Sequence, residues 1–281
     1  MLLSALIGLL VQAATPGNWA EEFFTGRTEG SSAIHIILSG RHGARERNVG
    51  RLDRDGALLL WCALPYLPIG FHVAVVDPGV GTARLPIAVA TVRGDILIGP
   101  DNGLLVAAAG RLGGIAAVHV LESAAHRLPT VSTSFHGRDI FAPAAAHLAM
   151  GVALADLGRA LDPATIVASP IHEPEIVPGE FRSSVVYVDT FGNVKLAGLR
   201  ADLEAALGPV RPGDPLRLQL GAGGEVATTW QTTFGDVAPG ATLVYEDSYG
   251  RICVAASQAD AARAHGLVDD LAVSVRRHNP D

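Results

Sequence analysis

The chain has little lysine, cysteine or aromatic character. Lys195 is the single lysine among 21 basic residues, and aromatic residues make up 5% of the sequence. The only two cysteines, Cys62 and Cys253, exclude a disulfide framework or a multi-thiolate metal site, so we expect buried, reduced thiols. The net charge of −7 at pH 7 excludes the broad basic face that nucleic-acid binding requires, and it gives no general attraction to an anionic membrane.

Long hydrophobic runs are also missing. The apolar opening, residues 1–14, is shorter than the roughly 20 residues that span a bilayer, and no basic residue precedes it as in a secretory signal. These features predict a cytoplasmic protein without a membrane partner.

The composition is that of a folded protein. With 281 residues, 49% hydrophobic content and a mean hydropathy of +0.32, the chain can bury a sizeable core in one large or two moderate domains. Between residues 56 and 165, short apolar runs alternate with Ala/Leu-rich stretches of helical spacing, which favours an α/β domain. The stretch 142–150 has proline near its start and predicts a helix.

The second half has a different pattern. Residues 168–180 contain three prolines and predict an extended linker. Beyond the linker, short strand-like runs recur between Gly, Pro and Asp breaks, which is typical of a small antiparallel β-barrel; they cover residues 182–188, 215–220, 228–233, 243–246, 252–255 and 271–276. We therefore predict an N-terminal α/β domain over 1–167, with 1–54 atypical, a linker over 168–180 and a β-barrel over 181–281.

Two short segments place chemically active side chains at the ends of apolar runs. Asp77 and Arg84 follow the predicted buried strand 71–76, and His136 precedes the predicted helix. Strand ends in α/β sheets are common ligand sites, although Asp77 could equally begin a simple Pro/Gly turn. The glycines at 79 and 81 do not form a dinucleotide fingerprint or a P-loop, so a nucleotide-triphosphate site is poorly supported.

Together with three further segments, these stretches resemble the S-adenosylmethionine hydroxide adenosyltransferase family, relatives of the fluorinating and chlorinating enzymes. The resemblance runs from about Asp55 to the C-terminus and is carried by the segments Val76–Thr82, Gly99–Leu105, Phe135–Ala145, Val188–Asn193 and Asp247–Arg251. It implies a Rossmann-like N-terminal domain, a smaller barrel, and a homotrimer that holds its ligand between protomers.

The resemblance also implies a substrate and roles for individual residues. The substrate would be S-adenosylmethionine, converted with water to adenosine and L-methionine without a cofactor or metal. Asp77, Arg84 and His136 occupy the positions of the family's Asp-Arg-His triad, which would hold and polarise water while Asp77 also contacts the nucleoside.

Other matching positions would contact the rest of the substrate. Asp189 would face the methionine amine, Asn193 the adenine, and Phe191 would offer an aromatic face, with Ser248 as a further contact. From the residues alone, without the other matching segments, the preferred interpretation of 189–193 is a hairpin turn with its aromatic ring packed inward. We expect Arg138 and Asp139 to form a structural ion pair or helix cap, and 101–103 to shape the pocket.

The sequence departs from the family before Asp55. No Thr/Ser-Asp-Phe/Tyr-Gly turn, which grips the ribose in the family, occurs there; instead, residues 40–54 carry five arginines. A shifted reading frame in a GC-rich gene is one hypothesis, and translation of the other two frames upstream of Asp55 tests it. Cys253 and Ser257 also stand where the family more often has Glu and Asn. A halogenase of the same superfamily, or a non-catalytic adenosine-binding homologue, are the alternative functions.

Overall fold

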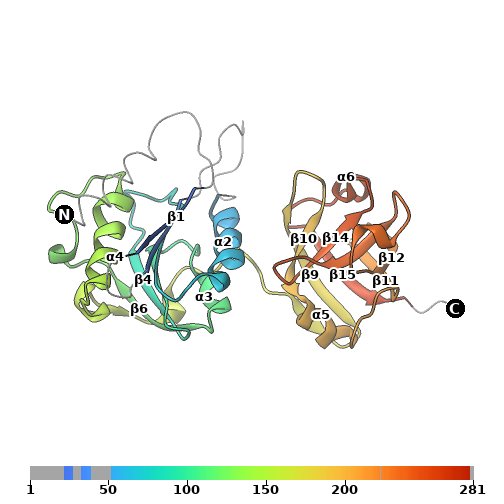
Figure 1. Ribbon diagram of the computed structural model, residues 1–281, viewed down its shortest axis with the longest axis horizontal. Helices are drawn as coiled ribbons and strands as arrows, with labels where there is room; N and C mark the ends of the chain where they lie inside the picture. Colours follow the sequence, from blue (N-terminus) through green and yellow to red (C-terminus); the bar gives the residue numbers. More distant parts are fainter. Residues whose placement is uncertain (1–21, 28–32, 39–51, 222, 279–281) are drawn as a thin grey trace. The chain divides into compact units, whose positions relative to one another are not determined.

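The computed structural model describes residues 22–27, 33–38, 52–221 and 223–278, and the chain forms two compact units, residues 1–170 and 171–281 (Figure 1). The arginine-rich segment lies mostly outside the described residues, so the departure before Asp55 stays a sequence observation. Each unit is described by itself. The unit boundary falls inside the predicted linker, whose exact limits stay a prediction.

The first unit is built on a seven-stranded mixed sheet. Its order is β1-β2-β3-β5-β4-β6-β7, with parallel pairing between β2 and β3 and between β3 and β5, and antiparallel pairing elsewhere. The strands are β1 (Glu22–Arg27), β2 (Ala33–Leu38), β3 (Phe71–Val75), β4 (Pro86–Thr91), β5 (Ile96–Pro100), β6 (Ile115–Val120) and β7 (Ala160–Leu161). The α/β prediction is confirmed, whereas β1 and β2 were not predicted.

Helices cover this sheet because its strands are apolar on both sides. In β3, the consecutive residues His72, Val73 and Ala74 are all buried, as expected for a strand with two covered faces. In Figure 1, α4 (Ala142–Ala149) lies on one side of the strands, and α2 (Leu52–Ala63) and α3 (Val106–Arg111) lie on the other. Short 3₁₀ turns complete the unit: η2 (Leu64–Tyr66), η3 (Ala124–His126), η5 (Leu154–Leu157) and η6 (Pro163–Thr165).

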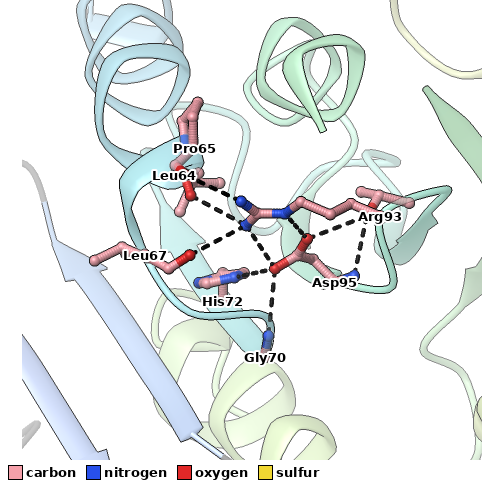
Figure 2. Close-up of polar contacts among 8 residues, drawn as sticks. Leu64, Pro65, Leu67, Gly70, His72, Arg93 and Asp95 are labelled. Atoms are coloured by element: carbon pink, nitrogen blue, oxygen red, sulfur yellow. Dashed lines mark hydrogen bonds and ion pairs between the residues drawn. The ribbon is translucent and has the colours of Figure 1, made fainter. Parts of the chain in front are cut away.

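A buried charged network fastens the N-terminal end of β3 (Figure 2). The Asp95 carboxylate contacts His72 Nε2 at 2.8 Å and accepts hydrogen bonds from Arg93 Nε at 2.7 Å and Nη2 at 3.0 Å. Arg93 also donates to the carbonyls of Leu64 and Pro65, both at 3.1 Å, in η2 directly after α2. Although burial alone would raise the pKa of Asp95, the hydrogen bonds from Arg93 and His72 outweigh it and lower the pKa. The network thus connects η2 to the β4–β5 turn.

The second unit is a closed barrel. Strand β10 pairs with both β14 and β9, so seven strands form a ring in the order β10-β14-β13-β12-β11-β15-β9, and β8 adds to β9. The strands are β8 (Glu175–Val177), β9 (Glu180–Val188), β10 (Val194–Leu199), β11 (Pro215–Leu220), β12 (Gly224–Trp230), β13 (Thr242–Glu246), β14 (Arg251–Ala256) and β15 (Ala272–Arg277). Helices α5 (Arg200–Leu207) and α6 (Ala261–His265) and turn η7 (Phe234–Asp236) connect them. The barrel prediction is confirmed, except that β12 and β13 pair in parallel.

Every second side chain along the strands points inward and fills the interior of the barrel. Ile252 and Val254 belong to the hydrophobic core, so the intervening Cys253 side chain faces the opposite side of β14. Both cysteines are buried thiols, as predicted. Burial raises the pKa of the Cys253 thiol to about 12, so the thiol stays protonated at neutral pH.

Candidate active site

The loop that follows β3 folds back on itself. The Val80 N–H donates to the Asp77 carbonyl at 3.3 Å, the Thr82 hydroxyl donates to the Gly79 carbonyl at 2.6 Å, and the Arg84 N–H donates to Thr82 Oγ1 at 3.3 Å. These local bonds close a tight turn between residues 77 and 84. The turn brings the Asp77 and Arg84 side chains together at the end of the strand.

Asp77 and Arg84 form a buried, two-point ion pair. Arg84 Nε donates to Asp77 Oδ1 at 3.1 Å, Arg84 Nη2 donates to Asp77 Oδ2, and each side chain is only 6% exposed. The guanidinium lies 5.4 Å from the centre of the Phe141 ring, which adds a cation–π contact. A planar guanidinium held at two points has a fixed orientation.

His136 contacts the same guanidinium. Arg84 Nη2 lies 3.0 Å from His136 Nδ1. Because arginine has donors and no acceptor, this bond requires Nδ1 to present its lone pair. A neutral His136 bonded in this way carries its proton on Nε2, which is then a donor.

The structure therefore brings together the three residues singled out in the first unit. One guanidinium nitrogen remains: Arg84 Nη1 is buried and makes no hydrogen bond within the described part of the chain. The N–H donors of a guanidinium point outward in a fixed, planar fork. One N–H of Nη1 therefore points to the side of the bond between Nη2 and His136. A buried donor without a partner is costly, which marks this point as suited to an oxygen atom supplied from outside the protein.

His136 is held at the start of an unusual helical turn. It caps the π-helical turn η4 (Gly137–Phe141), in which the Ala142 N–H bonds to the Gly137 carbonyl, and η4 runs directly into α4. The predicted helix with proline in its first turn is confirmed, and the helical segment begins earlier than predicted, with η4. Single π turns are frequently found at functional sites.

The 101–103 loop supports the end of β3. Asn102 Nδ2 donates to the Val76 carbonyl at 2.8 Å, directly before Asp77, and Asp101 Oδ1 accepts from the Val167 N–H at 2.9 Å. The bond from Asn102 to the Val76 carbonyl was not predicted from the sequence. It supports the peptide from which the Asp77 side chain extends.

In the second unit, residues 189–193 form the tip of the β9–β10 hairpin. Asp189 Oδ1 accepts from the N–H groups of Phe191 at 2.8 Å and Asn193 at 2.9 Å, while Oδ2 accepts from Asn193 Nδ2 at 2.8 Å. The hairpin prediction is confirmed, but the aromatic ring is not packed inward, since Phe191 is 78% exposed. The turn thus presents an aromatic face to its surroundings.

Residues 247–251 repeat the same turn at the tip of the β13–β14 hairpin. Asp247 Oδ1 accepts from the N–H groups of Tyr249 at 2.9 Å and Arg251 at 3.0 Å, and Gly250 has φ +82°, close to the +84° of Gly192. Ser248 is exposed in this turn. Lys195 forms an ion pair with the nearly buried Asp247. The repeat was readable in the sequence as the shared pattern Asp-x-(Phe/Tyr)-Gly, yet the sequence analysis missed it.

Other kinds of site find no support in the described residues. No group of three or more His, Cys, Asp and Glu side chains there is arranged to hold a metal ion. None of the helices described combines the length and the apolarity needed to cross a membrane.

An α/β unit with a buried Asp-Arg-His cluster, followed by a separate barrel, defines a class of two-domain proteins. Residues 47–158 match the model of the SAM hydroxide adenosyltransferase N-terminal domain, and residues 183–273 match that of the C-terminal domain. The chain belongs to the SAM hydroxide adenosyltransferase family.

Individual relatives agree with this assignment. The chain is 46% identical over 214 residues to an "(R)-S-adenosyl-L-methionine hydrolase" of Salinispora tropica, covering 76% of this chain and 77% of the relative. It is 38% identical to a Thermus thermophilus protein of the same name, covering 78% and 81%. A "Fluorinase" of Nocardia brasiliensis is 32% identical and covers 64% and 60%. Among solved structures, an uncharacterized conserved protein from Thermotoga maritima superimposes with a TM-score of 0.71 at 30% identity, covering 83% of this chain and 87% of that one.

Proposed function

We propose that this protein hydrolyses S-adenosylmethionine to adenosine and L-methionine. The observation that carries the proposal is the cluster in which Arg84 bridges Asp77 and His136 and keeps one buried donor, Nη1, without a hydrogen-bond partner among the described residues. The Salinispora tropica and Thermus thermophilus hydrolases are more similar to this chain, and cover more of it, than the Nocardia brasiliensis fluorinase.

In the proposed reaction, a water oxygen attacks the C5′ carbon of the substrate. The C5′–S bond breaks, its electron pair returns to sulfur, neutral methionine leaves, and the water gives up one proton as adenosine forms. Arg84 Nη1 is suited to hold the water oxygen and to stabilise its hydroxide character as the C–O bond forms. His136 Nε2–H lies on the opposite side of the ring from Arg84, so it offers a donor to a second oxygen at the site, and Asp77 keeps the guanidinium in place.

The barrel residues are proposed to bind the remainder of the substrate. An ionised carboxylate has about four lone-pair sites, and Asp189 uses three of them within its own turn, so one remains for an ammonium group. The exposed Phe191 ring suits stacking against a purine, with Asn193 at an adenine edge and Ser248 as a further polar contact. The homotrimer and the cytoplasmic location stay predictions.

Turnover in isotopically labelled water tests this function. Purified protein is incubated with S-adenosylmethionine in H₂¹⁸O, and the adenosine is analysed by mass spectrometry. We expect one ¹⁸O atom in the 5′-hydroxyl. A 5′-halogenated nucleoside on addition of halide would establish the halogenase instead, and binding without turnover would establish the non-catalytic homologue.

Variants connect the activity to the cluster. Arg84→Ala should lower kcat by about 10²-fold or more, as expected when a preorganised donor to a developing oxyanion is lost, with a smaller effect on substrate affinity. Arg159→Ala is the matched control, because this arginine also pairs with a carboxylate, Glu122, but is 53% exposed. Equal kcat values for the two variants would contradict the role of Arg84.

A further inference from the structure

Asp139 is a fully buried carboxylate, three residues after His136, that the proposed reaction does not use. Its side chain is 0% exposed. Arg138 Nε donates to Oδ1 at 2.6 Å, Arg138 Nη2 donates to Oδ2 at 3.1 Å, and the Ser132 N–H donates to Oδ2 at 2.7 Å. The ion pair expected from the sequence is confirmed, but the bond to Ser132 gives the carboxylate a second connection.

The bond to Ser132 connects Asp139 to the turn that carries Asp77 and Arg84. Ser132 is followed by Thr133, whose carbonyl oxygen would lie 2.7 Å from a Cβ atom added to Gly81. Gly81 is part of the turn between Asp77 and Arg84. The backbone that leads to His136 is therefore packed directly on the backbone that leads to Arg84, and Asp139 holds one side of this contact.

Asp139 also fixes the helical side of the segment. The N–H groups of Arg138 and Asp139 both donate to the Phe135 carbonyl, at 3.1 and 3.0 Å, and the Asp139 carbonyl accepts from the Leu128 N–H at 2.9 Å. Burial alone would raise the pKa of Asp139, but the bonds from Arg138 and Ser132, with a smaller contribution from His136, lower it. The carboxylate stays ionised at neutral pH and keeps all its bonds.

We propose that Asp139 is a positioning residue for the hydrolysis: its carboxylate holds residues 132–136 against the 77–84 turn and so fixes His136 Nδ1 within hydrogen-bond distance of Arg84 Nη2. This inference rests on the proposed function, since the geometry it protects is that of the water-activating cluster. A misplacement of about 1 Å at such a site lowers the rate by as much as 10²-fold.

Asp139→Asn is the test, and Asp95→Asn is its matched control. Both carboxylates are fully buried and bonded to an adjacent arginine, but Asp95 lies at the N-terminal end of the strand that precedes Asp77 (Figure 2). We expect both variants to lower the melting temperature by similar amounts. Only Asp139→Asn should lower kcat, by ten- to hundredfold, while KM changes less than about threefold.

A second measurement does not depend on turnover. Two-bond ¹H–¹⁵N spectra of the histidine rings, with His136 assigned from the His136→Gln variant, report which ring nitrogen carries the proton. Wild-type protein and Asp95→Asn should show His136 protonated on Nε2, and Asp139→Asn should show a mixture of tautomers. If the wild type does not hydrolyse the substrate but this difference appears, the positioning role stands and the proposed function falls.

Arg138→Gln covers the case in which Asp139→Asn does not fold. The Arg138 side chain is 38% exposed, so its loss is tolerated more easily, and it removes two of the bonds to Asp139. We expect an intermediate effect, about a threefold loss of kcat with a partial change in the His136 signals. Unchanged kcat and unchanged signals in the folded Asp139→Asn protein, or in Arg138→Gln if the former is insoluble, would overturn the proposal, as would an equal loss of kcat in Asp95→Asn.

Discussion

The two ring nitrogens of His136 face different tasks in the proposed reaction. Nδ1 accepts from Arg84, whereas Nε2 carries the proton and is the nitrogen proposed to donate to a second oxygen at the site. Glutamine places its amide near the Nε2 position, and asparagine near Nδ1. We predict that His136→Gln lowers kcat by about tenfold and His136→Asn by about 10³-fold, measured as adenosine released per enzyme.

The opposite order would assign the main role to Nδ1 and its contact with Arg84. The KM of both variants serves as the control for substrate binding and should stay close to the wild-type value.

At the residue level, the sequence identified the functional groups but not their contacts. Asp77 and His136 follow or precede apolar runs, which is a local pattern, whereas the contact between Arg84 and His136 joins positions 52 residues apart. The packing of η4 and α4 against β3 brings these positions together, and no periodicity in the sequence encodes that packing. That Arg84 Nη1 finds no hydrogen-bond partner in the described segments is likewise a property of the packed site, so it could not be predicted from the sequence.

The turn between Asp77 and Arg84 depends on the absence of a side chain at Gly81. Its φ of +79° and the nearby Thr133 carbonyl both oppose a Cβ atom. We predict that Gly81→Ala lowers kcat by about tenfold, because it separates the two backbone segments of the cluster. Steady-state kinetics measure the effect of the substitution on kcat, and thermal unfolding measures its effect on stability separately.

Gly151→Ala controls for the backbone effect alone. Gly151 has φ +94°, and a Cβ there would meet nothing within 4 Å. It should lose about 1 kcal/mol of stability with kcat unchanged. Similar kinetic losses in both variants would show that strain, and not the contact with Thr133, is responsible.

The tip of the β9–β10 hairpin gives a prediction about substrate binding. Because Phe191 is 78% exposed, Phe191→Ala should leave barrel stability within about 0.5 kcal/mol of the wild-type value. It should raise KM about five- to tenfold through lost stacking. Val268→Ala, at 61% exposure in the same unit, is the control and should change neither quantity.

Element prediction succeeded where patterns were local. Six barrel strands were found from their apolar runs, but β10 was missed because Lys195 and Gly198 interrupt it, and β8 was hidden in the proline-rich segment. The parallel pairing of β12 and β13 depends on how the connection through η7 crosses the barrel, which no turn signal reveals. The π turn before α4 was not predicted, since its sequence is also compatible with an ordinary helix.

In the barrel, the loss of folding stability at low pH should depend mainly on Glu180. A hydrogen bond from Ser274, together with Arg276 and Arg182, outweighs burial and lowers the pKa of Glu180 to about 2 from 4.5. A lowered folded-state pKa contributes stability that is present above the unfolded-state value and is lost as the pH falls from about 4.5 toward 2. We predict that Glu180→Gln destabilises the protein by about 2 kcal/mol at pH 7 in urea unfolding, and by less at pH 3.

Glu175→Gln is the control for this effect. Glu175 contacts the same Arg182, but its side chain is 66% exposed, so the free energy of unfolding should change by less than about 0.5 kcal/mol at either pH. A loss of stability for Glu180→Gln that does not depend on pH would contradict the charge-based explanation.

The π-helical turn also limits how the chain length can vary. Its bond from the Ala142 N–H to the Gly137 carbonyl encloses one residue more than an α-helical bond would. Deleting one residue between 137 and 141 would let the segment close as a regular α-helix and rotate everything before it by about 100° around the helix axis. His136 would then point away from Arg84 in an otherwise intact fold, so homologues that keep the cluster should not carry a deletion here.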